Sequence, residues 1–197
     1  FEINWRSDSI IRFIDGEGDS LAYSAAVLAD LPVGYWQLNA GTTAIDSSGN
    51  GYNGTYNGNA LITDGWFGAG SATYFDGNSD YINIPANSAF NSQLLSVEAW
   101  INPNTSAELW DGVISKSSNT SWNDGFGMYY DGSEIKFYVN DYATASVSSP
   151  VTLNRWSHVA ATYDGSQIAL FVNGELVDTL DYSNPINHST SNMLIGQ

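Results

Sequence analysis

RWSHVAATYDGSQIALFVNGELV, residues 155–177, decides the fold class of this chain. Three runs of apolar, aromatic and β-branched residues are separated by Tyr-Asp-Gly-Ser at 163–166 and by Asn-Gly at 173–174. An Asn-Gly pair between alternating runs is the strongest short-range signal for a two-residue β-hairpin. The segment therefore predicts consecutive antiparallel strands joined by tight turns.

The same pattern extends toward the N-terminus. Further strands are predicted at 35–38, 72–75, 81–84, 96–101, 112–116, 126–130 and 134–139, with turn-forming residues between them. Strict alternation in 134–139 and in 167–172 predicts one buried row on each strand. Those inner rows are Ile135, Phe137 and Val139 in the first strand and Ile168, Leu170 and Val172 in the second.

Helical periodicity occurs once, in LAYSAAVLA at 21–29, which follows a candidate N-cap at Asp19 or Ser20 and ends before Pro32. Strands at this spacing without intervening helices are typical of antiparallel sheets stacked as a sandwich. The sequence therefore predicts an all-β, two-sheet antiparallel sandwich with a short N-terminal helix.

Composition excludes some classes of partner. The chain has 197 residues, enough for one domain, or one domain with an appendage. Its formal net charge is −16, with only five Lys and Arg, so it repels nucleic acid and anionic lipid surfaces. No apolar run is long enough to cross a membrane. We therefore expect neither a nucleic-acid partner nor insertion into a membrane.

The ordered motifs VGYWQL, DSSGNGYNGTY, ATYFDGNSDYINIP, SVEAWINP and RWSHVAATYDGSQIALFVNGELV resemble those of laminin-G-like, concanavalin A-like jelly-roll domains. The resemblance covers about residues 31–197, with residues 1–30 as an N-terminal segment. It implies two curved antiparallel sheets, a concave face that often binds glycans, and frequently a structural Ca²⁺. The lead-in YSAAVLADLPVGYW is similar to segments that precede such domains in bacteriophage virion proteins and secreted bacterial proteins.

The chain departs from the family in one respect. Family members usually continue past the LIGQ-like strand into a closing strand patterned Asp-Glu-Val-x-Ile-Tyr, whereas this sequence stops at Gln197. An apolar, Arg-containing segment occurs instead in SDSIIRFID at 7–15. One hypothesis is that about residues 3–14 supply the closing strand, either in cis or to a neighbouring copy. The alternative is that residues 1–20 form a linker or the tail of a preceding domain.

The polar stretch DSSGNGYNGTY at 46–56 has two interpretations. Calcium binds oxygen ligands, and Asp46, Asn50 and Asn53 would supply a carboxylate and two amides. The resemblance places the family's calcium against this loop, and Asp8 would replace the ligand of the absent closing strand. The other interpretation is a loop built from Asx turns that holds no ion.

Catalysis has little support in the sequence. His158 lies in an alternating strand, and it resembles a structural position of the family. Glu98 has no second carboxylate two or four residues along its strand, although glycoside hydrolysis normally needs a pair. We therefore expect a protein that is not an enzyme.

Binding is the function that the residues favour. Aromatic side chains fall on outward strand positions or in the loops expected at residues 104–124 and 140–150, Trp110 among them, where they suit either glycans or protein partners. The candidate glycan-binding residues are Trp122, Asn123, Asp124, Tyr129, Tyr138 and Tyr142.

The expected role is that of an extracellular or virion-surface domain that is stabilised by calcium. It would attach to glycans or cell-surface polysaccharide, assemble with other copies of itself or with virion or filament subunits, or do both. The alternative is an accessory carbohydrate-binding module of a secreted hydrolase.

Overall fold

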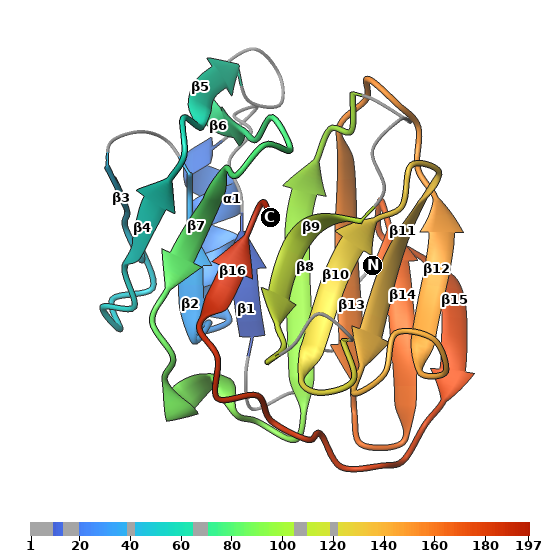
Figure 1. The fold of residues 1–197 in the computed structure, drawn as a ribbon. Helices are drawn as coiled ribbons and strands as arrows, with labels where there is room; N and C mark the ends of the chain where they lie inside the picture. Colours follow the sequence, from blue (N-terminus) through green and yellow to red (C-terminus); the bar gives the residue numbers. More distant parts are fainter. Residues whose placement is uncertain (1–9, 14–19, 39–41, 65–70, 105–109, 119–121) are drawn as a thin grey trace.

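Two β-sheets stacked face to face make up the computed structural model (Figure 1). The structure describes residues 10–13, 20–38, 42–64, 71–104, 110–118 and 122–197. Eight of its strands form one sheet and six the other, and a separate two-stranded hairpin lies at one end. The predicted all-β sandwich is confirmed.

The six-stranded sheet has the order β15-β14-β13-β8-β1-β2. Its strands are β15 (Glu175–Asp181), β14 (Gln167–Val172), β13 (Ser157–Tyr163), β8 (Leu95–Ile101), β1 (Ile10–Phe13) and β2 (Gly34–Trp36). The turn between β14 and β15 is the predicted Asn-Gly hairpin. Asn173 and Gly174 have φ of 52° and 83°, the left-handed pair that a type I′ turn requires.

The eight-stranded sheet has the order β12-β11-β10-β9-β16-β7-β4-β3. Its strands are β12 (Ser146–Pro150), β11 (Glu134–Val139), β10 (Phe126–Tyr130), β9 (Asp111–Lys116), β16 (Met193–Ile195), β7 (Tyr81–Ile84), β4 (Gly54–Asn57) and β3 (Thr43–Ala44). The hairpin at the end of the sandwich pairs β5 (Leu61–Asp64) with β6 (Ser71–Tyr74).

The core lies between the sheets, and the predicted inner rows face it. Ile135, Phe137, Val139, Ile168 and Leu170 are all fully buried there. The remaining predicted residue of the inner rows, Val172, is half-buried and packs against the same cluster. Truncation of a buried Phe in such a core typically costs about 3–5 kcal/mol, so this row is a main source of stability.

The predicted helix is also confirmed, as α1 (Ser20–Ala29). It lies on the outer face of the six-stranded sheet, where the Tyr23 hydroxyl donates to Glu98 on β8 at 2.9 Å and Ser24 pairs with the Tyr35 hydroxyl on β2 at 3.1 Å. A single 3₁₀ turn, η2 (Ser88–Phe90), follows β7. None of the helices in the described ranges is long and apolar enough to cross a membrane.

The N-terminal strand β1 differs from the rest of the structure. It lies between β8 and β2 of its own chain and runs parallel to both, whereas every other pairing among the described strands is antiparallel. β1 therefore does not lie beside β16, which pairs with β7 and β9. The rest of the expected donor segment, residues 3–9, lies outside the described residues, and strand donation to another copy stays a prediction.

One segment that the sequence suggested as a loop contains a strand. β12 occupies 146–150 and pairs with β11. Its only large apolar side chain, Val147, is buried, and serines surround it. Alternation with a single large apolar residue is too weak a signal to distinguish a strand from a polar loop.

Candidate functional site

Asp46, the predicted charged metal ligand, anchors the polar loop through backbone amides. It is 6% exposed. Its Oδ1 accepts the N–H of Tyr35 at 3.0 Å and that of Ser48 at 2.9 Å, and its Oδ2 accepts the N–H of Tyr52 at 2.9 Å. These bonds join the loop to β2 and fix the turn that follows, which is the usual role of Asp in an Asx turn.

The two predicted amide ligands serve the same loop. Asn53 Oδ1 accepts the N–H of Asp46 at 2.9 Å, and Asn50 Nδ2 donates to the carbonyls of Pro32 at 3.2 Å and Val33 at 3.0 Å. The structure therefore brings the three predicted loop ligands together, but around backbone groups.

This arrangement does not fit a calcium site well. Calcium takes six to eight oxygen ligands, and the Asp46 and Asn53 oxygens already face N–H donors. Among the described residues, no three His, Asp or Glu side chains are grouped so that they could hold a metal. Asp8 lies outside those residues. Calcium binding stays a prediction, and the hydrogen bonds favour the Asx-turn interpretation of the loop.

The outer face of the eight-stranded sheet carries a cluster of five aromatic rings, here called the aromatic platform. Its members are Trp110, Trp122, Tyr129, Tyr138 and Tyr142. The Trp110 ring centroid lies 5.6, 5.3 and 5.5 Å from those of Trp122, Tyr129 and Tyr142. The Trp122 ring is parallel to the Tyr138 ring, with centroids 6.1 Å apart and an interplanar angle of 3°. Edge-to-face and offset pairs at such distances are favourable.

Burial divides the platform into a base and a contact layer. Tyr129 on β10 and Tyr138 on β11 point outward as predicted, but both are buried, with Tyr138 only 1% exposed. Trp110 is 44% exposed, and Trp122 and Tyr142 are half-buried. Only these three residues of the platform are therefore open to solvent, and the two tyrosines lie beneath them.

The two buried phenols are neutral at ordinary pH. Burial, reinforced by the charge of Asp131 and by Tyr142, raises the pKa of Tyr129 to about 12. Burial also raises the pKa of Tyr138. The Ser117 side chain lies near enough to the Tyr138 hydroxyl to oppose part of this rise in pKa, but the hydroxyl has no partner with regular hydrogen-bond geometry among the described residues. Since an unsatisfied buried hydroxyl is costly, this atom is a polar group that an ordered water could satisfy.

Local backbone conformation holds the platform in place. Trp110 and Trp122 have φ of 76° and 46°, a left-handed conformation that is unusual for bulky residues. Such strain persists only where the surroundings enforce it, and it concentrates at functional sites. Gly127 makes room for the base, since a Cβ at this position would lie 2.6 Å from the Tyr138 ring.

Asp124 and Asn123, two further predicted contact residues, differ in position. Asp124 is buried, and its carboxylate accepts from the Ser117 hydroxyl at 2.7 Å, the Ser118 N–H at 2.8 Å and the Ser118 hydroxyl. Burial opposes its ionisation, but these bonds outweigh burial and lower the pKa of Asp124. Asp124 therefore clamps the segment that precedes β10, whereas Asn123 is exposed beside Trp122.

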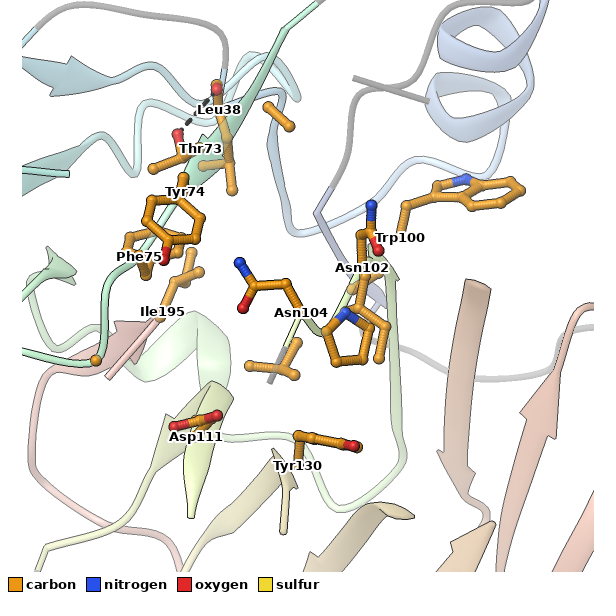
Figure 2. A pocket seen from close by; sticks show the side chains of 18 of the residues that line it. Leu38, Thr73, Tyr74, Phe75, Trp100, Asn102, Asn104, Asp111, Tyr130 and Ile195 are labelled. Carbon is orange, nitrogen blue, oxygen red and sulfur yellow. Dashed lines mark hydrogen bonds between the residues drawn. The ribbon is translucent and has the colours of Figure 1, made fainter. Parts of the chain in front are cut away.

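A cavity of about 350 Å³ opens at the end of the sandwich, between the β5–β6 hairpin, the end of β8 and the start of β9. Figure 2 shows the Asn104 amide pointing into it opposite Tyr74 and Phe75, with Asp111 and Tyr130 on another side. Its volume lies near the lower end of the range for small-ligand pockets, roughly 300 Å³. The described residues that line it include no Lys or Arg, so it suits a small neutral ligand better than an anion.

Glu98, the carboxylate that the sequence suggested as a candidate for glycoside hydrolysis, lies under helix α1. Glu98 is buried on the outer face of the six-stranded sheet, bonded to Tyr23 of α1 and 3.8 Å from His158 Nε2. The His158 ring packs against Trp100, with centroids 5.3 Å apart. Glu98 therefore joins the sheet to the helix, and His158 packs against Trp100 on the neighbouring strand.

Comparison with solved structures shows the same fold in bacterial toxin domains. The chain matches the botulinum neurotoxin serotype C1 binding domain with a TM-score of 0.65 and 19% identity, over 86% of this chain and 43% of that chain. A botulinum neurotoxin type C structure described with two ganglioside molecules matches with a TM-score of 0.65 and 19% identity, over 87% and 44%. The binding domain of botulinum neurotoxin DC in complex with SialylT matches with a TM-score of 0.59 and 18% identity, over 80% and 41%. This chain thus spans less than half of each.

No curated protein matches the chain. A family model does: residues 76–197, more than half of the chain, match the laminin G-type model described as the concanavalin A-like lectin/glucanases superfamily. The match begins at the turn before β7 and contains both strands of the platform's base. The chain therefore belongs to the concanavalin A-like lectin/glucanases superfamily, as a laminin G-like jelly-roll domain.

Proposed function

We propose that this chain is a non-enzymatic glycan-binding domain that acts outside the cell, with the aromatic platform as its contact surface. The observation that carries the proposal is the position of Trp110. It is 44% exposed, although its ring contacts three other aromatic rings. An exposed indole held rigidly in this way contributes apolar area to a complex with little loss of side-chain freedom on binding.

The platform also has the polar groups that a sugar requires. Asn123 is exposed beside Trp122 and presents its amide to solvent. A sugar ring offers apolar C–H faces together with hydroxyls, and so it matches a surface with rings at the centre and amide or phenol groups near them.

The comparisons support a binding role in general terms. The solved neighbours are named as toxin binding domains, one with gangliosides and one with SialylT. Those ligands belong to the toxins, and this chain spans less than half of each of those binding domains. Their relevance here is that a jelly roll of this shape occurs in glycan-binding proteins.

Replacing Trp110 with Ala tests the proposal on a glycan array, followed by calorimetric titration of the strongest binder. A central Trp in an interface typically contributes about 2 kcal/mol or more, so the variant should bind at least about thirtyfold more weakly. The matched control is Leu176→Ala, which removes another exposed apolar side chain, on β15 of the other sheet. Unchanged affinity in Trp110→Ala with an intact far-UV spectrum would refute the platform as the contact surface.

The other expected roles stay proposals. These are assembly with other copies or with virion or filament subunits, stabilisation by calcium, and service as an accessory module of a secreted hydrolase. Sedimentation analysis of the native material addresses assembly, because a protein that is monomeric at all concentrations forms no filament.

A further inference from the structure

The charges around the aromatic platform are predominantly negative. Asp141 precedes Tyr142, and Asp131 lies close enough to Tyr129 for its charge to raise the pKa of that phenol. The chain as a whole carries a formal net charge of −16. An anionic ligand that approaches the platform is therefore repelled by the carboxylates of Asp131 and Asp141.

The cations on the strands of the platform are already engaged. Lys136 lies directly across from Tyr129 in the β10–β11 pairing, and so it is next to the platform's base. Its Nζ lies 2.7 Å from Asp131 Oδ2 and 3.9 Å from Glu134 Oε2, which leaves the group with a net negative charge.

Lys116 on β9 is equally unavailable to a ligand. It is 2% exposed, and its Nζ donates to the carbonyl oxygens of Ser189 at 2.6 Å and Ser191 at 3.4 Å. Burial lowers the pKa of Lys116, and the nearby Asp124 only partly opposes this effect. Neither lysine can therefore pair with an incoming acidic group unless it first gives up its present contacts.

On these grounds, and resting on the proposed function, we infer that the platform selects glycans without acidic groups, and that Asp131 enforces this by neutralising Lys136. A sialylated or sulfated glycan would bring a charge that Asp131 and Asp141 repel, and it would find no free cation on the platform's described strands. Like charges brought together in this way suppress the wrong partner more than they assist the right one.

The test is an array of matched pairs, in which each neutral glycan is printed beside its acidic derivative, for example lactose with 3′-sialyllactose. The neutral member should bind about three- to tenfold more tightly at low ionic strength, and the ratio should shrink in about 0.5 M salt, where the Debye length is only about 4 Å. Tighter binding of the acidic members would overturn the selectivity and leave the proposed function standing. An array without signal for any glycan would overturn the proposed function itself.

A comparison of two Asp→Asn variants tests whether Asp131 in particular causes the preference for neutral glycans. Asp131 and Asp164 both lie in Tyr-Asp-Gly-Ser turns, and the Oδ1 of each accepts two backbone N–H groups, contacts that Asn can keep. Asp131→Asn breaks the contact with Lys136. The ratio of the affinity for a neutral glycan to the affinity for its acidic derivative should therefore fall by about threefold. Asp164→Asn, on the six-stranded sheet, should leave the ratio unchanged. Equal effects of the two variants would overturn the role of Asp131.

Discussion

The loop at 46–53 gives the most decisive prediction, which concerns Asp46→Asn. The Asn oxygen can keep the two bonds that Oδ1 now accepts, from Tyr35 and Ser48, but its NH₂ group would face the N–H of Tyr52. A lost bond to a charged acceptor costs about 1.5–3 kcal/mol, and a buried N–H without a partner adds to that. We expect a loss of about 3 kcal/mol, which for a chain of this size lowers Tm by roughly 6–12 °C.

Thermal unfolding in calcium and in excess EDTA distinguishes the two interpretations of the loop. If backbone amides saturate Asp46, the chelator leaves the Tm of the wild type unchanged, and the variant is less stable by the same amount in both buffers. If the loop instead holds calcium, an ion at about a hundredfold excess over its Kd adds about 2.7 kcal/mol. In that case EDTA would lower the Tm of the wild type by several degrees and leave the variant unaffected, and that result would refute the hydrogen-bond account.

A matched control is Asp76→Asn. Asp76 is exposed and forms an Asx turn of the same kind, in which its Oδ1 accepts the Asn78 N–H at 2.8 Å. Because the turn is open to water, this variant should lose less than about 1 kcal/mol. A loss as large as that of Asp46→Asn would show that the cost does not come from the buried amide contacts.

Three further predictions concern the sheets. Gly127→Ala puts a Cβ 2.6 Å from the Tyr138 ring, so overpacking should cost about 1–3 kcal/mol and alter Trp fluorescence; an unchanged spectrum would mean that the ring does not rest on the glycine. Burial opposes ionisation of Asp131, but bonds from Lys136, the Glu134 N–H and Ser133 hold its pKa at about 2, below the ordinary value. Its contribution to stability is therefore complete above about pH 4 and is lost as the pH falls through about 2, so urea unfolding should show Asp131→Asn less stable than wild type at pH 7 and equal to it near pH 2. Deletion of residues 1–18 removes β1 and exposes the facing edges of β2 and β8, so Tm should fall and light scattering should show association; a monomer of unchanged Tm would show that β1 is dispensable.

The strands were predictable where burial imposes a period of two. Ile135, Phe137 and Val139 read as one inner row because the two faces of β11 differ sharply in polarity, and the structure buries all three. β1 was predictable as an apolar segment but not in its place. Nothing in four residues specifies a position between β8 and β2 or a parallel direction, since both follow from which sheet edges remain unpaired after the other strands have formed.

The loop at 46–53 illustrates a second limit. Calcium ligands and Asx-turn anchors are the same residue types, because both use Asp and Asn oxygens as acceptors. What separates them is whether backbone N–H groups have already taken those oxygens. That depends on the distance from Asp46 to Tyr35 and Tyr52, residues that the sequence places 11 and 6 positions away.

The aromatic platform shows that alternation along a strand predicts which face a side chain occupies but not whether it is exposed. Alternation correctly assigns Tyr129 and Tyr138 to the outer face, but a residue on an outer face is exposed only if no other segment covers it. Here Trp110 and Trp122 cover them from adjoining segments, in left-handed conformations that no hydrophobic period encodes. The side chains that a ligand would meet are therefore supplied by irregular segments, and the regular strands supply the base on which those segments rest. In such a domain a substitution in the base should reduce affinity by displacing the tryptophans, whereas a substitution in the contact layer should reduce affinity and leave the fold intact.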